Sequence, residues 1–166
     1  MRSHEQYLKA MQLLESPESY PGLAVRPYAR TLLRIWRYPS FHPYSSWALI
    51  QVESQVFLRR VTWDQSQVLA SRPVTFGSEV LIEAREYQGL LSQLREIQLP
   101  PFITVAQHGI DGVSYGVEVA AFGLSARLSW WQTPPAEWAA LESWHSEAIE
   151  KFDGLLPVST PSIGRD

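Results

Sequence analysis

The sequence predicts an α+β fold, a single domain in which helices pack on one face of a twisted antiparallel sheet of about five strands. Three observations lead to this prediction. Apolar residues recur at helical spacing in three segments, near the start, the middle and the end of the chain. The runs between these segments are rich in β-branched and aromatic residues, as strands are. Short turns join neighbouring runs, and strands joined by tight turns are antiparallel. The expected order is one helix, three strands, one helix, two strands and a last helix.

Residues 5–15 are predicted to form the first helix. Ser3 and Gln6 have the spacing of a capping box, in which each side chain satisfies a free backbone N–H of the other. Pro17 ends the helix because proline cannot continue it. The apolar stripe of this helix consists of Tyr7, Met11 and Leu14.

Three strands are expected at residues 28–38, 45–53 and 55–63. A short polar turn near Ser54 joins the second and third strands as a hairpin. The turn lacks an Asn-Gly pair, so the register of this hairpin stays open. A slip of one residue would exchange the two faces of the strand.

Residues 83–98 are predicted to form the second helix, which Pro100 and Pro101 end. Gly89 inside it costs ~1 kcal/mol relative to alanine. The start of the helix is open, because residues 79–82 also suit a short strand. The apolar positions at helical spacing are Tyr87, Leu90, Leu91, Leu94 and Ile97.

The second hairpin, residues 113–120 and 124–131, follows a turn at Asp111-Gly112. One register satisfies two independent criteria, apolar matching on one face and charge complementarity on the other. It places Glu118 opposite Arg127. The apolar pairs are Val119 with Ala126, Val117 with Leu128 and Tyr115 with Trp130, and we expect Tyr115, Val117, Leu128 and Trp130 to be buried.

The last helix is predicted to begin after Thr133, a candidate cap, with Pro134 or Pro135 in its first position. Gly154 is expected to end it. Residues 154–166 are rich in proline and serine, so we expect a domain at residues 1–153 and a flexible tail after it. The apolar face consists of Trp138, Leu141, Trp144, Ala148, Ile149 and Phe152.

The composition excludes several classes of protein. The chain has 166 residues, no cysteine and a formal net charge of -3, so disulfides, thiolate metal sites and a cysteine nucleophile are impossible. A mildly acidic balance argues against a duplex-DNA binder, which needs a basic excess. No apolar run approaches the ~18 residues of a membrane span, and the N-terminal residues lack the apolar core of a signal peptide. We therefore expect a cytoplasmic protein with no membrane or nucleic-acid partner.

The residues that most often carry chemistry form no recognisable motif. No two histidines have metal-binding spacing, and we interpret His145 as a surface or half-buried helix residue. His42 lies in an aromatic loop, and any role of His42 or His108 stays open. His108, Asp111 and Glu118 are the best candidates for acid–base work, but a straight strand separates Asp111 from Glu118 by ~20 Å. The sequence thus predicts no catalytic, metal-binding or cofactor-binding residue.

Arginine-rich strands offer a better candidate surface. Alternation places Arg30 and Arg34 on the same face as Trp36 and Tyr38. The hairpin places Arg127 opposite Glu118, and whether these residues lie on that same face of the sheet stays open. Such a face can bind a carboxylate, a phosphate or a protein through bidentate guanidinium contacts and ring stacking. The competing interpretation is that the arginines pair with acidic residues such as Glu118 across a solvated face.

Trp131 completes the set of candidates. If Trp130 is in the core, Trp131 lies on the other face, where an exposed tryptophan is a common interface anchor. Alternatively, a loop or the N-terminal helix covers it. The candidate partner-binding residues are Arg30, Arg34, Trp36, Glu118, Arg127 and Trp131.

Three stretches within about residues 108–145 carry a resemblance. They are Asp111-Gly112-Val113-Ser114-Tyr115-Gly116-Val117-Glu118, Trp130-Trp131 and Pro135-Ala136-Glu137-Trp138-Ala139-Ala140-Leu141. This region is similar to the C-terminal part of small bacterial proteins of unknown function that have a D-G-x-x-Y-x-x-E hairpin followed by a W-x-x-L helix. Some of these look like immunity or accessory proteins, so the resemblance implies a protein that binds a partner and has no catalytic residue.

The leading hypothesis is therefore a non-catalytic bacterial protein-binding domain of immunity or accessory type. The alternative is a small-molecule or anion-binding domain that uses the arginine–aromatic face of the sheet, and an enzyme comes third. The shape of that face discriminates between the first two. A flat aromatic surface favours a protein partner, whereas a deep polar pocket favours a ligand.

Overall fold

The computed structural model describes residues 2–66, 73–100, 103, 109, 111–121 and 124–161. Its helices are α1 (Arg2–Glu15), α2 (Ala84–Glu96) and α3 (Ala139–Leu155), with 3₁₀ turns η1 (Pro17–Ser19) and η2 (Ala136–Trp138). Its strands are β1 (Arg30–Pro39), β2 (Tyr44–Val52), β3 (Gln55–Asp64), β4 (Val74–Ile82), β5 (Val113–Ala121), β6 (Leu124–Trp131) and β7 (Thr160–Pro161). The predicted α+β class is confirmed.

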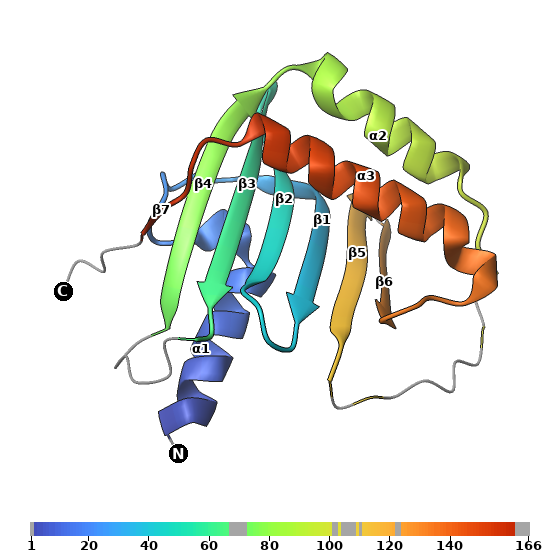
Figure 1. Cartoon of the computed structure of the whole chain (residues 1–166). Helices are drawn as coiled ribbons and strands as arrows, with labels where there is room; N and C mark the ends of the chain where they lie inside the picture. The colour runs from blue at the N-terminus through green and yellow to red at the C-terminus, as the bar shows by residue number, and fades with distance from the viewer. Residues whose placement is uncertain are drawn as a thin grey trace.

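All strands belong to one antiparallel sheet in the order β6-β5-β1-β2-β3-β4-β7 (Figure 1). The two predicted hairpins, β2–β3 and β5–β6, are both present. The strand that the sequence indicates only in part is β4, because residues 79–82 form its second half. The chain then returns from α2 to place β5 beside β1, so the first and second hairpins flank β1.

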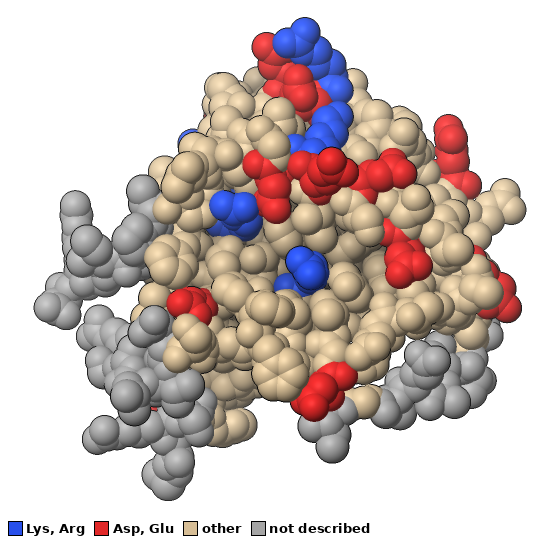
Figure 2. All heavy atoms as spheres, viewed as in Figure 1, with Lys and Arg blue, Asp and Glu red and all other residues tan. Residues whose placement is uncertain are grey.

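Helices α2 and α3 cover the first face of the sheet, which Figure 1 shows with α3 crossing in front of the strands. Trp144 of α3 donates its indole N–H to the carbonyl of Leu90 in α2 at 2.9 Å and so joins the two helices. The surface of α3 is acidic, as Figure 2 shows from this side. The main apolar core lies beneath and includes Leu33, Ile35, Leu49, Leu58, Val117, Trp130, Leu141 and Phe152.

Helix α1 packs on the second face, over β2 and β3, through Ala10 and Leu14. The sequence predicts helices on one face only, so this is an addition to the predicted packing. Arg59 of β3 is fully buried here. Its guanidinium donates to Glu79 and to main-chain carbonyls of the segment after α1, those of Pro17, Glu18 and Ala24. These charge-assisted bonds fix that segment to the sheet.

The register predicted for the β5–β6 hairpin is confirmed in every pair, including Glu118 opposite Arg127. Val117 and Trp130 are buried, whereas Tyr115 and Leu128 are half-buried against the core. The open register of the other hairpin is resolved by pairing of Val52 with Gln55 across a two-residue turn.

The predicted ends of the last helix need correction. The chain first makes the turn η2, and α3 begins at Ala139 without a side-chain cap, so Thr133 does not cap it. Gly154 lies within the last turn, and α3 continues to Leu155. Beyond it, the carbonyl of Pro157 accepts a hydrogen bond from Ser78 at 2.8 Å. Among the described residues, no helix has the length and apolar character needed to cross a membrane.

Candidate functional site

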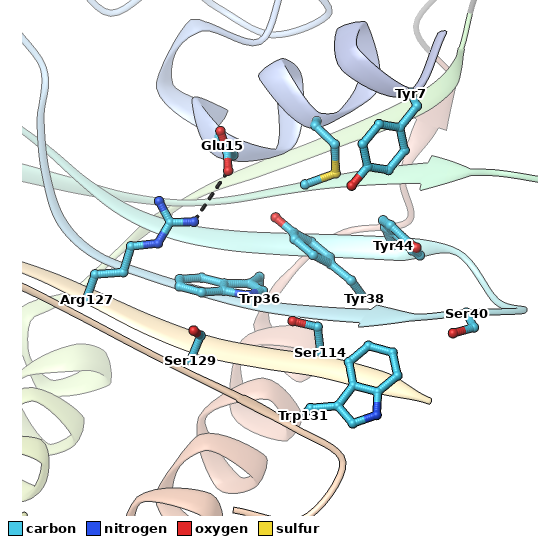
Figure 3. A pocket seen from close by; sticks show the side chains of 11 residues that line it. Tyr7, Glu15, Trp36, Tyr38, Ser40, Tyr44, Ser114, Arg127, Ser129 and Trp131 are labelled. Carbon is cyan, nitrogen blue, oxygen red and sulfur yellow. Dashed lines mark hydrogen bonds and ion pairs between the residues drawn. The ribbon is translucent and has the colours of Figure 1, made fainter. Parts of the chain in front are cut away.

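A groove of about 380 Å³ lies on the second face, between α1 and the part of the sheet that α1 leaves uncovered (Figure 3). We call it the aromatic groove. One wall is Tyr7 and Met11 of α1, and the floor is formed by β1, β5 and β6. The lining residues are Tyr7, Met11, Glu15, Trp36, Tyr38, Ser40, Tyr44, Ser114, Arg127, Ser129 and Trp131.

The floor of the aromatic groove is built from stacked rings. Tyr38 stacks on Tyr44 with ring centroids 5.0 Å apart, and Trp36 stacks on Tyr38 at 6.4 Å. Alternation in β1 puts Trp36 and Tyr38 on one face, and Gly116 on the neighbouring strand makes room for the indole of Trp36. A Cβ at residue 116 would overlap that ring.

Two arginines of this face are already neutralised. Arg34 bonds Glu118 at 2.6 Å, and Arg127 reaches Glu15 of α1 at 3.4 Å. Both guanidinium groups also contact the ring of Trp36, at 4.8 Å for Arg34 and 5.0 Å for Arg127. The carboxylates therefore balance the positive charge at this end of the groove.

The hydroxyl of Tyr38 lies deep beneath the groove wall. Burial raises the pKa of Tyr38 far above its ordinary value, with the nearby Arg34 opposing that shift. Its oxygen is shielded from solvent, and the side chain of Ser46 nearby also opposes the shift. Tyr38 is thus a neutral phenol at physiological pH, and it contributes ring surface to the groove rather than charge.

Five of the six residues predicted to bind a partner lie together. Arg34, Trp36, Glu118 and Arg127 are in mutual contact through ion pairs and ring contacts, and Trp131 lines the same groove. Trp131 is half-buried, because its ring packs against Gly112 in the turn before β5. Both interpretations of Trp131 are therefore partly right: a turn covers one side of it, and the groove exposes another.

Arg30 is the exception, and its predicted placement is wrong. The pairing of β1 with β2 shifts between Thr31 and Leu33, which inserts Leu32 as an extra residue. A bulge of one residue exchanges the faces on either side of it. Arg30 consequently lies on the face covered by α2, away from Arg34.

His145 is fully buried, which corrects its interpretation as a surface or half-buried residue. Its Nε2 lies 3.2 Å from the carbonyl oxygens of both Trp36 and Gly116, so Nε2 carries a hydrogen and donates. Burial lowers the pKa of His145 to about 4, and nearby Arg37 adds to the effect. The imidazole is a neutral clamp between β1 and β5. His42 is exposed in its loop, and His108 lies outside the described residues.

Sequence reasoning missed the α1 wall and the place of Tyr44 in the ring stack beneath the groove. Tyr7 was assigned to the apolar stripe of its helix, yet it remains 42% exposed and faces the groove. Alternation along β1 places Tyr38 on the face of Trp36, whereas Tyr44 lies beyond a loop and reaches that face only through the pairing of β2 with β1. Nothing local in the sequence signals that α1 packs beside them.

The described part of the chain holds no group of three or more histidine, aspartate or glutamate side chains that could bind a metal ion. The chain matches no protein-family model, and comparisons with curated proteins and with solved structures find no similar protein.

Proposed function

We propose that this chain is a non-catalytic protein-binding domain of immunity or accessory type, and that the aromatic groove receives an extended segment of its partner. The observation that carries the proposal is the combination of an open groove lined by five aromatic rings with cations that are already paired. The cytoplasmic location expected from the sequence stays a prediction.

The paired charges favour a protein segment over an anion at this face. An anion bound to Arg127 or Arg34 would compete with Glu15 or Glu118 for the same guanidinium. Aromatic rings and neutral hydroxyls, such as those of Ser114 and Ser129, offer contact area and hydrogen bonds to a neutral segment instead. Tyrosine and tryptophan are enriched in interfaces for this reason.

The position of β6 favours an extended segment. β6 is the last strand on its side of the sheet, and among the described residues no strand pairs with its outer edge. Its residues Arg127, Ser129 and Trp131 point into the groove. A peptide that pairs with a free edge gains backbone hydrogen bonds and places alternate side chains on one face. A partner segment rich in apolar or aromatic side chains would fill the groove.

The test is the substitution Trp131→Ala, measured with a partner that copurifies with the wild-type chain and is then identified and prepared separately. The expected result is binding weakened by ~2 kcal/mol or more, about thirtyfold in Kd. Phe41→Ala is the matched control, because Phe41 is 75% exposed and does not line the groove.

Thermal melts of each variant accompany the binding measurement. A half-buried Trp131 should leave the fold intact after substitution, at a cost well below the 3–5 kcal/mol of a core tryptophan. Equal affinities of wild type and Trp131→Ala for the partner would contradict the proposal. A Trp131→Ala variant that is destabilised yet binds the partner normally once folded would also contradict the proposal.

A further inference from the structure

A second groove, of about 570 Å³, lies on the opposite face between α2 and the ends of β1, β2 and β5. The groove forms because α2 packs against α3 at the buried Leu90, whereas the other side of α2 lies over the sheet. Tyr87 and Leu91 of α2 and Leu32 and Val119 of the sheet give it an apolar lining. We call it the α2 groove.

Two arginines, Arg30 and Arg95, line the α2 groove, and a specific feature of the fold places each of them there. Arg30 lies there because the bulge at Leu32 reverses its face. Arg95 lies in the last turn of α2. Neither guanidinium has a carboxylate partner among the described residues, unlike Arg34, Arg59 and Arg127, which are all paired.

We propose that the α2 groove binds a single-chain amphiphile with an anionic head, of which a medium-chain carboxylate is the simplest case. Arg30 and Arg95 hold the head by charge-assisted hydrogen bonds, which planar guanidinium groups make well to carboxylates. The alkyl chain lies between α2 and the sheet against Leu32, Leu91 and Val119. This site is separate from the aromatic groove and does not depend on the function proposed there.

The size and the chemistry of the α2 groove agree with this ligand. Ligand pockets usually have volumes of roughly 300–1,000 Å³ and combine apolar walls with a few polar groups that fix orientation. The groove is within that range. An uncharged apolar ligand would leave both arginines unused, and a cationic amphiphile would meet them with like charge.

The experiment is isothermal titration calorimetry of the full chain with decanoate below its micelle concentration. Decyltrimethylammonium, with the same chain length and the opposite charge, is the ligand control. The proposal expects saturable binding of decanoate at one site and no binding of the cation. Arg30→Gln and Arg95→Gln should each weaken decanoate binding about tenfold, and the double variant should abolish it.

Each substitution has a matched control on the same element. Arg37→Gln on β1 and Arg85→Gln on α2 remove exposed arginines that do not line the groove, and both should bind decanoate as the wild type does. Ser92→Trp, a change at an exposed groove residue, should block the site by bulk without altering its charge. Circular dichroism checks that each variant is folded.

Three results would overturn the proposal. They are equal binding of decanoate and decyltrimethylammonium, binding of decanoate that survives in the double arginine variant, and no binding of decanoate to the wild type at millimolar concentration. Equal losses in the groove variants and in their matched controls would show a general effect of net charge and would also overturn it.

Discussion

The two faces of the sheet are stabilised by different kinds of contact. The face under α2 and α3 buries a continuous apolar core, in which side chains such as Leu58 and Phe152 are completely inaccessible. The face under α1 has a small apolar cluster around Leu14 and Tyr20, and beside it lie the buried guanidinium groups of Arg34 and Arg59. Apolar packing dominates the first face, and directed polar contacts hold the second.

This difference shapes the aromatic groove on the second face. Apolar packing stabilises in proportion to the area removed from water, whatever the direction of the contact. Charged groups need partners in fixed directions, and Arg59 finds them in Glu79 and in the segment after α1. These bonds fix the segment after α1, and with α1 packed over β2 and β3, β1, β5 and β6 remain partly uncovered.

The largest expected effect tests the apolar face. Phe152→Ala removes a fully buried ring and should lower the free energy of unfolding by about 4–5 kcal/mol, the cost of lost burial plus a cavity. Tyr7→Ala, on α1 and 42% exposed, should cost less than about 1 kcal/mol. Chemical denaturation measures both. A similar cost for the two variants would break the distinction between the faces.

The second effect tests the polar face. Arg59→Met keeps an apolar side chain of similar length but leaves three main-chain carbonyls without their donor, so we expect a loss of about 3–4 kcal/mol. Arg60→Met is the matched control, because Arg60 is the next residue, faces α3 and pairs with the 41% exposed Asp153. It should cost about 1 kcal/mol or less. The reverse order of the two costs would contradict the assignment.

The third effect is a pH dependence that comes from the apolar face. His145 has a pKa of about 4 when folded and 6.5 in its ordinary state, so the unfolded chain binds the proton first. The stabilisation that depends on a neutral His145 is therefore complete above about pH 6.5. As the pH falls to about 4, its loss lowers the free energy of unfolding by up to about 3 kcal/mol. Denaturation midpoints between pH 7.5 and 4 measure the loss.

His145→Gln is the informative control for this pH dependence. The amide of glutamine can donate from nearly the same position as Nε2 but does not titrate. The variant should therefore be less acid-sensitive than the wild type in this range. An unchanged pH profile would show that the acid sensitivity arises elsewhere.

The smallest effect concerns the β2–β3 turn, which belongs to neither face of the sheet. Glu53, the first residue of the β2–β3 turn, has a φ of 54°, a region that glycine adopts at little cost. Glu53→Gly should therefore stabilise the chain by about 0.5–1 kcal/mol in chemical denaturation. Ser54→Gly should not, because the φ of Ser54 is not positive. A loss of stability in Glu53→Gly would contradict the idea that the turn is strained.

Local patterns in the sequence were enough to predict most of the elements and one full register. The register of the β5–β6 hairpin was predicted correctly because the apolar pairs and the pair of Glu118 with Arg127 select the same alignment. β4 was recognised only in part, because Thr75, Gly77 and Ser78 give it no apolar alternation. Those positions are small and polar for a tertiary reason: the ring of Tyr20 lies against Gly77, and its hydroxyl bonds Thr75.

The candidate site was predicted in the parts that alternation governs. Trp36, Arg127 and Trp131 share the groove, although the sequence left open whether β1 and the hairpin present them on the same face. Arg30 does not share it, because a bulge is set by the fit between strands and leaves no clear mark in composition. The α1 wall was missed for a related reason. The segment that follows α1 is bonded to Arg59, which lies about 40 residues later in the sequence, so its place is set by a long-range contact.

Because Gly116 has no side chain, groups on both faces of the sheet contact the backbone at this one position. On one side, the missing carbon admits the indole of Trp36 to the groove floor. From the other, His145 donates to the backbone oxygens of these same two residues. A guest that shifts the indole of Trp36 would therefore act on a residue whose backbone oxygen the imidazole holds from the other side. We therefore expect the ring resonances of His145, which lies on the side of α3 that faces the sheet, to report whether the opposite surface is occupied.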